Sequence, residues 1–170
     1  MKQLNIIIAG IGGQGINSFV RMLHEKCEQQ HWHCISAVYK GGAQRLGSVR
    51  AEIKLFSPEY PNVDRKSSQI IPGTLDFLLA LEQWESLRYL PYCNEKTKVI
   101  LDSFIEFPPG TKNIQPKPIP PDEQIKNLLA QVTVEPFREK ALAIDGNTRN
   151  TLKAMWNKAL MNTEFTNLNL

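Results

Sequence analysis

The chain has 170 residues, of which 42% are hydrophobic and 22% charged, and its formal net charge at pH 7 is +3. This length supports one core, so we expect residues 1–170 to form a single domain. Charges of both signs are interspersed, which argues against nucleic-acid binding, and the apolar stretch Ile6–Ala9 is too short for a signal peptide or a membrane span. We therefore expect a cytoplasmic protein that binds neither nucleic acid nor a membrane.

The cysteine and histidine residues do not form a metal-binding pattern. Cys27, Cys34 and Cys93 are odd in number and widely spaced, so we expect reduced thiols that pack as small hydrophobic side chains. They also lack the close pairs that hold zinc or iron–sulfur clusters. His31 and His33 flank a tryptophan after a helical pattern and are interpreted as a polar helix end. We predict no metal site and no catalytic residue in this chain.

The first part of the chain predicts a strand, a helix and a second strand. Residues 4–9 form a β-branched run that ends in glycines, which is typical of a strand buried on both faces of a parallel sheet. Apolar residues at helical spacing over 16–27 predict an amphipathic helix, and residues 34–39 predict a second strand. Such a unit should have a right-handed crossover between parallel strands.

Residues 49–56 alternate apolar and polar side chains with a period of two. This pattern predicts a strand with one wet face, which we place at an edge of the sheet and for which an antiparallel direction remains open. The predicted fold class is a three-layer α/β/α, Rossmann-like arrangement with a mostly parallel sheet.

The alternation of strand and helix continues after this segment. Residues 77–81 predict a buried strand, residues 84–90 a helix, and residues 99–101 a further short strand. Glu82 and Glu85 follow the first of these strands, and we interpret them as a solvated helix start that benefits from the helix dipole.

The second half begins with a proline-rich segment. Six prolines between residues 107 and 121 exclude a helix or a central strand and predict an extended surface connector. A helix should begin at Pro121, a last strand should cover 132–134, and a helix should cover 152–160. The polar tail 162–170 is expected to be frayed.

A glycine-rich turn follows the first strand. Its sequence satisfies the G-x-G-x-x-G spacing between a strand and a helix, a context in which exposed N–H groups and the helix dipole favour an anion. We expect Gly10 to make the tight turn, Gly12 to let a ligand approach, and Gly15 to allow close packing of helix on strand. The candidate contact residues of this turn are Gly10, Gly12, Gly13, Gln14 and Gly15.

Two nucleotide-binding classes fit this turn poorly. A dinucleotide site needs an acid at the end of the second strand, where this chain has Val38–Gly42. Lys40 could favour a 2′-phosphate, but no candidate hydride-transfer site follows. A Walker-type loop is excluded because no Lys-Ser or Lys-Thr follows the glycines. The glycines therefore either bind a phosphate or a partner's loop, or only let strand and helix pack tightly.

A second loop, residues 40–49, combines glycines with an amide, a guanidinium and a hydroxyl. At the carboxyl edge of a parallel sheet the end of the second strand lies near the glycine turn, so both loops should form one surface. Arg45 is the natural contact for a carboxylate or phosphate, although pairing with a surface acid is an open alternative. We add Gln44, Arg45 and Ser48 to the candidate contact residues.

The motifs together resemble the γ-type subunit of 2-oxoacid:ferredoxin oxidoreductases, and most closely the β subunit of indolepyruvate ferredoxin oxidoreductase. Order and spacing agree over about the first hundred residues. The matching segments are Ile6–Gly15, Ala43–Arg45, Gly47–Val49, Ile71–Gly73, Leu78–Glu82, Glu85 and Leu87–Leu90. Leu46 stands where this family usually has a glycine, Lys40 where indolepyruvate members often carry histidine, and the C-terminal region is shorter than is typical.

The resemblance implies a subunit that does not complete the chemistry alone. In such enzymes a 2-oxoacid is decarboxylated on thiamine diphosphate, electrons pass through iron–sulfur clusters to ferredoxin, and coenzyme A accepts the acyl group. The chain would pack on the large subunit that holds these cofactors and form a homodimer when isolated, and its two loops would face either the partner subunit or a phosphate of coenzyme A. The alternatives are a stand-alone nucleotide- or phosphate-binding module and a diverged regulatory subunit.

Overall fold

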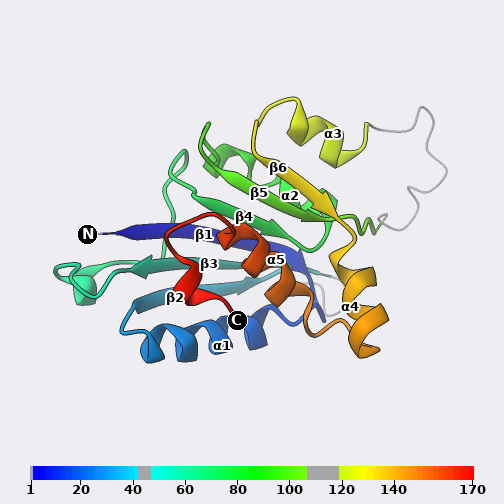
Figure 1. Ribbon diagram of the computed structural model, residues 1–170. Helices are drawn as coiled ribbons and strands as arrows, with labels where there is room; N and C mark the ends of the chain where they lie inside the picture. Colours follow the sequence, from blue (N-terminus) through cyan, green and yellow to red (C-terminus); the bar gives the residue numbers. More distant parts are fainter. Residues whose placement is uncertain (1, 42–46, 107–118) are drawn as a thin grey trace.

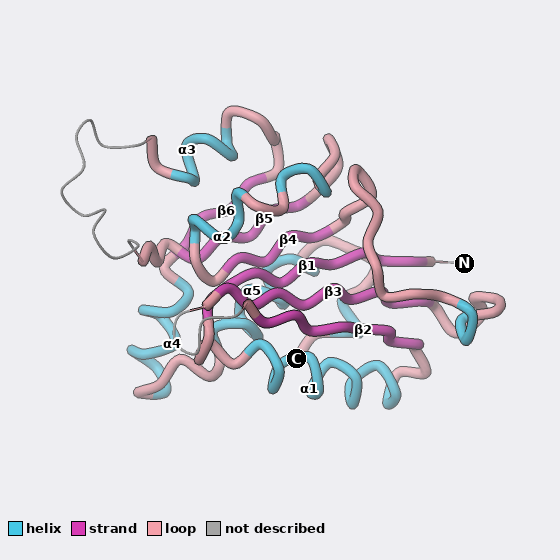
Figure 2. Tube along the Cα trace, turned by 180° about the vertical axis from the view of Figure 1, so that it is seen from behind, coloured by secondary structure: helices cyan, strands magenta, loops and turns pink. Residues whose placement is uncertain are grey.

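The computed structural model describes residues 2–41, 47–106 and 119–170, which include one six-stranded sheet with helices on both faces (Figures 1 and 2). The strand order is β2-β3-β1-β4-β5-β6. β1, β4, β5 and β6 pair in parallel, whereas β3 is antiparallel to both of its neighbours. The predicted three-layer, mostly parallel fold class is confirmed. The strands are β1 (Gln3–Ile11), β2 (His33–Lys40), β3 (Ser48–Phe56), β4 (Phe77–Ala80), β5 (Lys98–Asp102) and β6 (Val132–Glu135).

The strand β3 runs antiparallel but is not the edge strand that its sequence pattern suggested. It lies between β2 and β1, and the half-exposed β2 forms the edge. Among the polar residues of β3 only Glu52 is buried; it pairs with Arg50 (Nε to Oε1, 3.1 Å) and accepts a hydrogen bond from the Ile70 backbone N–H (3.0 Å). Arg50 and Lys54 on the same face are partly exposed, so the alternation reflects both partial exposure and a buried, paired carboxylate.

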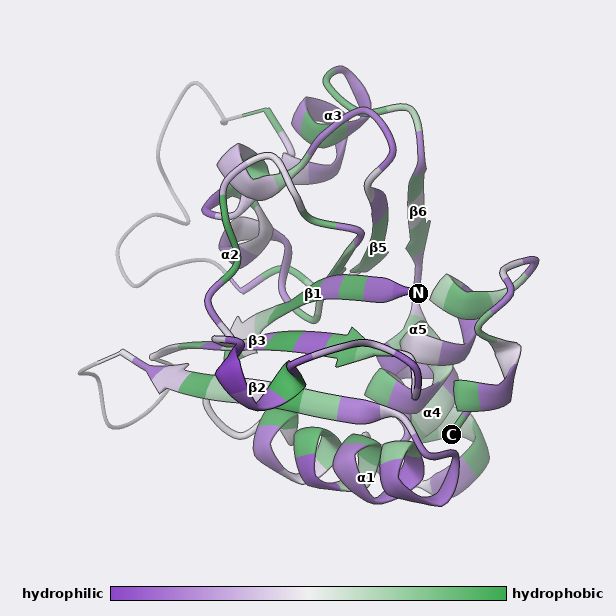
Figure 3. Ribbon diagram, turned by 90° about the vertical axis from the view of Figure 1, so that its left-hand side faces the viewer, coloured by the Kyte–Doolittle hydropathy of each residue, from purple (hydrophilic) through white to green (hydrophobic). Residues whose placement is uncertain are grey.

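Helices cover the two faces of the sheet, and each face has its own hydrophobic cluster. α1 and α5 pack on one face, and α2 and α3 lie over the other (Figure 1). α1 buries residues at helical spacing, including Phe19 and Leu23, and Figure 3 shows the resulting bands of hydrophobic and hydrophilic residues along this helix. The helices are α1 (Ile16–Gln29), α2 (Gln83–Leu87), α3 (Pro121–Lys126), α4 (Phe137–Asp145) and α5 (Thr151–Leu160), with short 3-10 turns η1 (Val63–Arg65), η2 (Leu90–Tyr92) and η3 (Thr166–Leu168).

Most predicted elements are present, and α4 is an addition. The helix start at Pro121 is confirmed, whereas most of the proline-rich connector, residues 107–118, lies outside the described residues. α4 escaped the sequence pattern because it buries only Phe137 and Ala141 and exposes Leu142 and Ile144. Over the described ranges, no helix is both long enough and apolar enough to cross a membrane.

The C-terminal tail is packed, so the expectation that it frays is wrong. Leu168 is fully buried, and its carbonyl oxygen accepts a hydrogen bond from Trp156 Nε1 at 2.8 Å. Asn157 and Leu170 exchange two hydrogen bonds, with Nδ2 donating to the Leu170 carbonyl and the Leu170 N–H donating to Oδ1 (both 2.9 Å). A buried indole needs a partner for its N–H group, and the tail supplies it.

We expect Trp156→Phe to lower the free energy of unfolding by about 1–3 kcal/mol, because it leaves the Leu168 carbonyl unpaired and a gap beneath the tail. Urea unfolding followed by circular dichroism measures this change. Trp32→Phe is the matched control, since Trp32 is partly exposed and touches Phe165 only by ring edge. A loss no larger than the control's would contradict an anchoring role for Trp156.

Candidate functional site

The glycine turn connects β1 to α1 through left-handed backbone conformations. Gly13 has φ +93° and Gly15 has φ +78°, values that side chains rarely tolerate. No heavy atom lies within 4 Å of where a Cβ of Gly15 would be, so Gly15 serves backbone conformation. The expectation that it permits close packing of helix on strand is therefore wrong.

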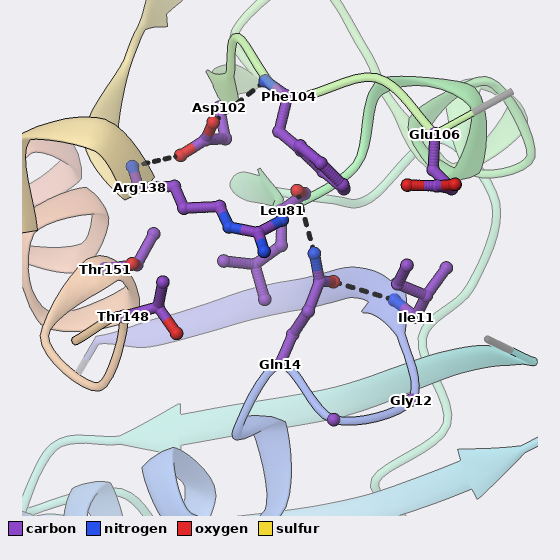
Figure 4. A pocket seen from close by; sticks show the side chains of 11 residues that line it. Ile11, Gly12, Gln14, Leu81, Asp102, Phe104, Glu106, Arg138, Thr148 and Thr151 are labelled. Carbon is purple, nitrogen blue, oxygen red and sulfur yellow. Dashed lines mark hydrogen bonds between the residues drawn. The ribbon is translucent and has the colours of Figure 1, made fainter. Parts of the chain in front are cut away.

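The side chain of Gln14 fixes this turn from inside. Its Oε1 accepts a hydrogen bond from the Ile11 N–H (2.8 Å), and its Nε2 donates to the Leu81 carbonyl oxygen (3.2 Å), which ties the turn to the end of β4 (Figure 4). Gly10 lies within β1 and not in the turn, contrary to its predicted role. A Cβ there would overlap the Gln14 amide oxygen and lie 3.2 Å from Leu81 Cβ, so a larger residue would displace the Gln14 amide.

The two loops meet as the sequence predicted, at least in their described parts. The Gly12 N–H of the glycine turn donates to the Gly47 carbonyl of the second loop (2.9 Å), and within that loop the Gly41 N–H donates to the Ser48 carbonyl (2.7 Å). Gln44 and Arg45 lie outside the described residues, so their contact roles stay predictions. The glycine turn thus borders the beginning of β3, which lies between β1 and the predicted neighbour β2.

A pocket of about 580 Å³ lies between these loops and the first turn of α1; its lining includes Lys40, Gly41, Gly47 and Asn17. α1 has no side-chain cap and no acidic residue in its first turn. The free N–H groups of its first turn and the aligned peptide dipoles therefore offer a site of positive potential. Lys40 adds a cationic side chain from the end of β2. We call this the α1 pocket, and its chemistry suits a phosphate group.

A second hollow of about 410 Å³ shares Lys40 and Gly41 with the α1 pocket. It adds basic and aromatic side chains, namely Arg50, Arg88, Tyr39, Tyr89 and Tyr92. The Arg50 guanidinium lies over the Tyr39 ring at 4.3 Å. We call this the basic–aromatic hollow. Sequence analysis missed it because its residues come from separate segments that only the folded sheet brings together.

Of the acidic pair near this hollow, Glu82 is buried and Glu85 is half-buried, which corrects the expectation of a solvated helix start. Glu82 is 2% exposed and caps α2, accepting hydrogen bonds from the backbone N–H groups of Glu85 (2.9 Å) and Glu106 (3.1 Å). Glu85 accepts a hydrogen bond from Ser48 Oγ (2.6 Å) and pairs with Arg88 (3.3 Å). The Ser48 hydroxyl, a predicted contact residue, is therefore already engaged as a donor.

The thiols have no features of nucleophiles or metal ligands. The neighbouring Cys27 thiol and burial raise the pKa of Cys34 above its usual range, and burial raises the pKa of Cys93 to about 11. Such thiols stay protonated near neutral pH and react poorly. Across residues 2–41, 47–106 and 119–170, no three His, Cys, Asp or Glu side chains gather where they could hold a metal ion.

Residues 5–163 match the protein family "Pyruvate ferredoxin/flavodoxin oxidoreductase". The indolepyruvate oxidoreductase subunit IorB of Methanothermobacter thermautotrophicus is 33% identical over 128 residues, which cover 75% of this chain and 61% of that protein. The subunit of the same name from Pyrococcus horikoshii is 30% identical over 152 residues, covering 85% of this chain and 66% of the relative. The chain thus spans less than two thirds of the length of these relatives.

Solved structures share the fold at lower sequence identity. The pyruvate oxidoreductase subunit PORC of Thermotoga maritima superimposes with a TM-score of 0.64 at 14% identity, covering 95% of this chain and 78% of that one. The 2-oxoglutarate:ferredoxin oxidoreductase of Magnetococcus marinus, solved with 2-oxoglutarate, coenzyme A and succinyl-CoA bound, gives 0.60 at 18% identity over 99% of this chain and 26% of that one. The γ subunit of a keto/oxoacid ferredoxin oxidoreductase from Geobacter sulfurreducens gives 0.58 at 20% identity over 99% and 91%.

We expect Gly10→Ala to destabilise the chain by about 1–3 kcal/mol, because the new methyl group displaces the Gln14 amide. Gln14→Ala should also destabilise it, by loss of two hydrogen bonds. In the double variant the new methyl group at position 10 occupies the space that the Gln14 side chain leaves. The double variant should therefore be more stable than the sum of the two single losses predicts, by at least about 0.5 kcal/mol in chemical denaturation. Strict additivity of the two single changes would argue against the steric link.

Burial raises the pKa of Glu82 despite its hydrogen bonds to backbone N–H groups. When the pKa of a carboxyl group is higher in the folded than in the unfolded state, the folded state loses stability as pH rises from the unfolded-state pKa to the folded-state pKa. Glu82→Gln removes this titration, so its stability relative to the original chain should increase as pH rises above the ordinary carboxyl pKa of about 4. Urea unfolding at increasing pH provides the test, and a pH-independent difference would contradict the raised pKa.

Proposed function

The chain belongs to the pyruvate ferredoxin/flavodoxin oxidoreductase family, and on this premise we propose that it is the small subunit of an indolepyruvate-type 2-oxoacid:ferredoxin oxidoreductase. The similarity to two IorB subunits, at 30% and 33% identity, supports this assignment most directly. We propose that it folds as one domain, acts in the cytoplasm, forms a homodimer when isolated, and packs on a large subunit that holds thiamine diphosphate and iron–sulfur clusters and delivers electrons to ferredoxin.

We further propose that the chain contributes a phosphate-binding surface for coenzyme A. The α1 pocket supplies uncapped backbone N–H groups and Lys40, which match a pyrophosphate in charge and hydrogen-bonding capacity. Among the described residues Lys40 makes no ion pair, so its charge is available. The Gln44–Arg45 segment would extend the same surface.

The basic–aromatic hollow fits the other end of such a ligand. The ring of Tyr39, which is 41% exposed, offers a stacking face for an adenine base, and the largely exposed Arg88, although paired with Glu85, offers charge for a further phosphate. The hollow adjoins the α1 pocket through Lys40 and Gly41. One extended nucleotide could therefore lie across both, with its reactive thiol directed to the partner subunit. In this arrangement the chain binds and orients the acyl acceptor, while the reaction occurs on the cofactors of the large subunit.

The decisive experiment isolates the tagged chain from its native host under anaerobic conditions and gentle salt. Mass spectrometry and absorbance then identify what comes with it. A large subunit with thiamine diphosphate and iron–sulfur absorbance supports the proposed assembly. Recovery of the chain alone, in a preparation that keeps other complexes intact, would contradict it and favour a stand-alone phosphate-binding module or a diverged regulatory subunit.

In the purified complex we expect Lys40→Gln to raise KM for coenzyme A about tenfold and to leave kcat nearly unchanged, because it removes one charge-assisted contact to a phosphate. Initial rates at varied coenzyme A concentration measure both constants. Lys96→Gln is the matched control, since Lys96 is exposed and lines neither pocket. Equal KM values for the two variants would remove Lys40 from the binding site.

A further inference from the structure

A third pocket shares the glycine-turn residues Ile11–Gln14 with the α1 pocket but is otherwise lined by different residues, and the proposed coenzyme A contact does not use these. Its volume is about 200 Å³, and its lining joins the glycine turn to the beginnings of α4 and α5 (Figure 4). The polar residues are Arg138, Thr148, Thr151, Asp102 and Glu106. Ligand pockets for drug-sized molecules are usually about 300–1,000 Å³, so this one suits a smaller molecule.

Thr151 carries a buried hydroxyl without a partner. The residue is 3% exposed, lines the pocket, and its Oγ1 forms no hydrogen bond to any described residue. It is the first residue of α5, a ten-residue helix that has neither a side-chain cap nor an acidic residue in its first turn. An unpaired buried hydroxyl is unfavourable, and native proteins rarely keep one unless a ligand or water satisfies it. Thr151 and the start of α5 thus point to an absent acceptor.

Arg138 provides the matching charge. Its guanidinium lies over the Phe104 ring at 4.2 Å and forms no ion pair within the described part of the chain. Asp102 holds these two residues in place rather than neutralising the guanidinium. Its Oδ2 accepts a hydrogen bond from the Arg138 backbone N–H (2.6 Å) and its Oδ1 accepts one from Phe104 (2.9 Å). The guanidinium donors therefore remain available to a ligand.

The charges are separated along the pocket. Figure 4 shows Arg138, Thr148 and Thr151 together at one end and Glu106 at the other. We propose that this pocket binds the carboxylate or phosphate group of a small molecule between Arg138, Thr148 and Thr151, with a hydrogen-bond donor of the same molecule directed to Glu106. Guanidinium and hydroxyl donors beside a helix N-terminus are the groups that recognise either oxyanion. This inference does not depend on the proposed oxidoreductase function.

The test is a titration of the ¹⁵N-labelled full chain with inorganic phosphate and, separately, with acetate, followed by two-dimensional NMR. We expect saturable shifts of the Thr148, Thr151 and Arg138 amides with at least one of the two anions, and the anion that binds tighter identifies the group. Shifts at Asn17 and Gly41 report the α1 pocket separately. Absence of saturation at Thr148, Thr151 and Arg138 with both anions would overturn the proposal.

Two variants address the contacts directly. Arg138→Gln should weaken binding at this pocket at least about tenfold. Thr151→Val is isosteric and removes an unpaired hydroxyl, so it should fold, raise the thermal unfolding temperature of the ligand-free chain, and weaken binding about threefold or more. Arg149→Gln is the control, because Arg149 is exposed and does not line the pocket, and it should bind like the original chain. Unchanged binding in Thr151→Val would overturn the assignment even if Arg138→Gln failed to fold.

Discussion

The Gln14 amide is the interaction on which the organisation of the carboxyl edge depends. It joins the Ile11 N–H to the Leu81 carbonyl and so fixes the glycine turn between the ends of β1 and β4. The amide occupies the space that a side chain at Gly10 would need. With the turn held in this way, its residues line both the α1 pocket, which includes Lys40, and the third pocket, which includes Arg138.

At this edge three carboxylates, those of Glu82, Glu85 and Asp102, are engaged, and two cations, Lys40 and Arg138, form no ion pair with the described residues. Glu82 and Glu85 accept hydrogen bonds from backbone N–H groups, from Ser48 and from the Arg88 side chain. Asp102 is likewise occupied by two backbone N–H groups. These carboxylates already have partners within the chain. The positive charges of Lys40 and Arg138 therefore dominate the electrostatic potential of the α1 pocket and of the third pocket, respectively. The arrangement favours anionic ligands although the chain as a whole carries a formal charge of only +3.

The sequence predicted those features that depend on local pattern. The apolar run of residues 4–9 correctly predicted the strand β1, and the helical spacing over 16–27 correctly predicted α1. The alternation over 49–56 correctly predicted a strand, β3. What the sequence could not specify was the neighbour of each element. β3 lies inside the sheet because it pairs with both β1 and β2, and its Glu52 bonds the distant Ile70 N–H; no periodicity reveals either contact. The packed tail depends in the same way on one indole N–H of Trp156.

In the candidate site, too, the sequence identified local motifs but not the contacts between elements. α4 is the element that the sequence missed and that contributes Arg138 to the site. The glycine motif identified the turn, but it assigned Gly10 and Gly15 roles that belong to a dinucleotide-binding turn. Here Gly10 lies within β1 beside the Gln14 amide, and Gly15 has the left-handed backbone conformation that precedes α1. α4 gave no helical signal because it buries little, yet its first turn presents Arg138, and Asp102 at the end of β5 caps that turn. A helix that contributes little to the core can persist when its role is to position a charge. The weak amphipathicity of α4 is therefore consistent with a site element, whereas α1 and α5 stabilise the sheet that carries it.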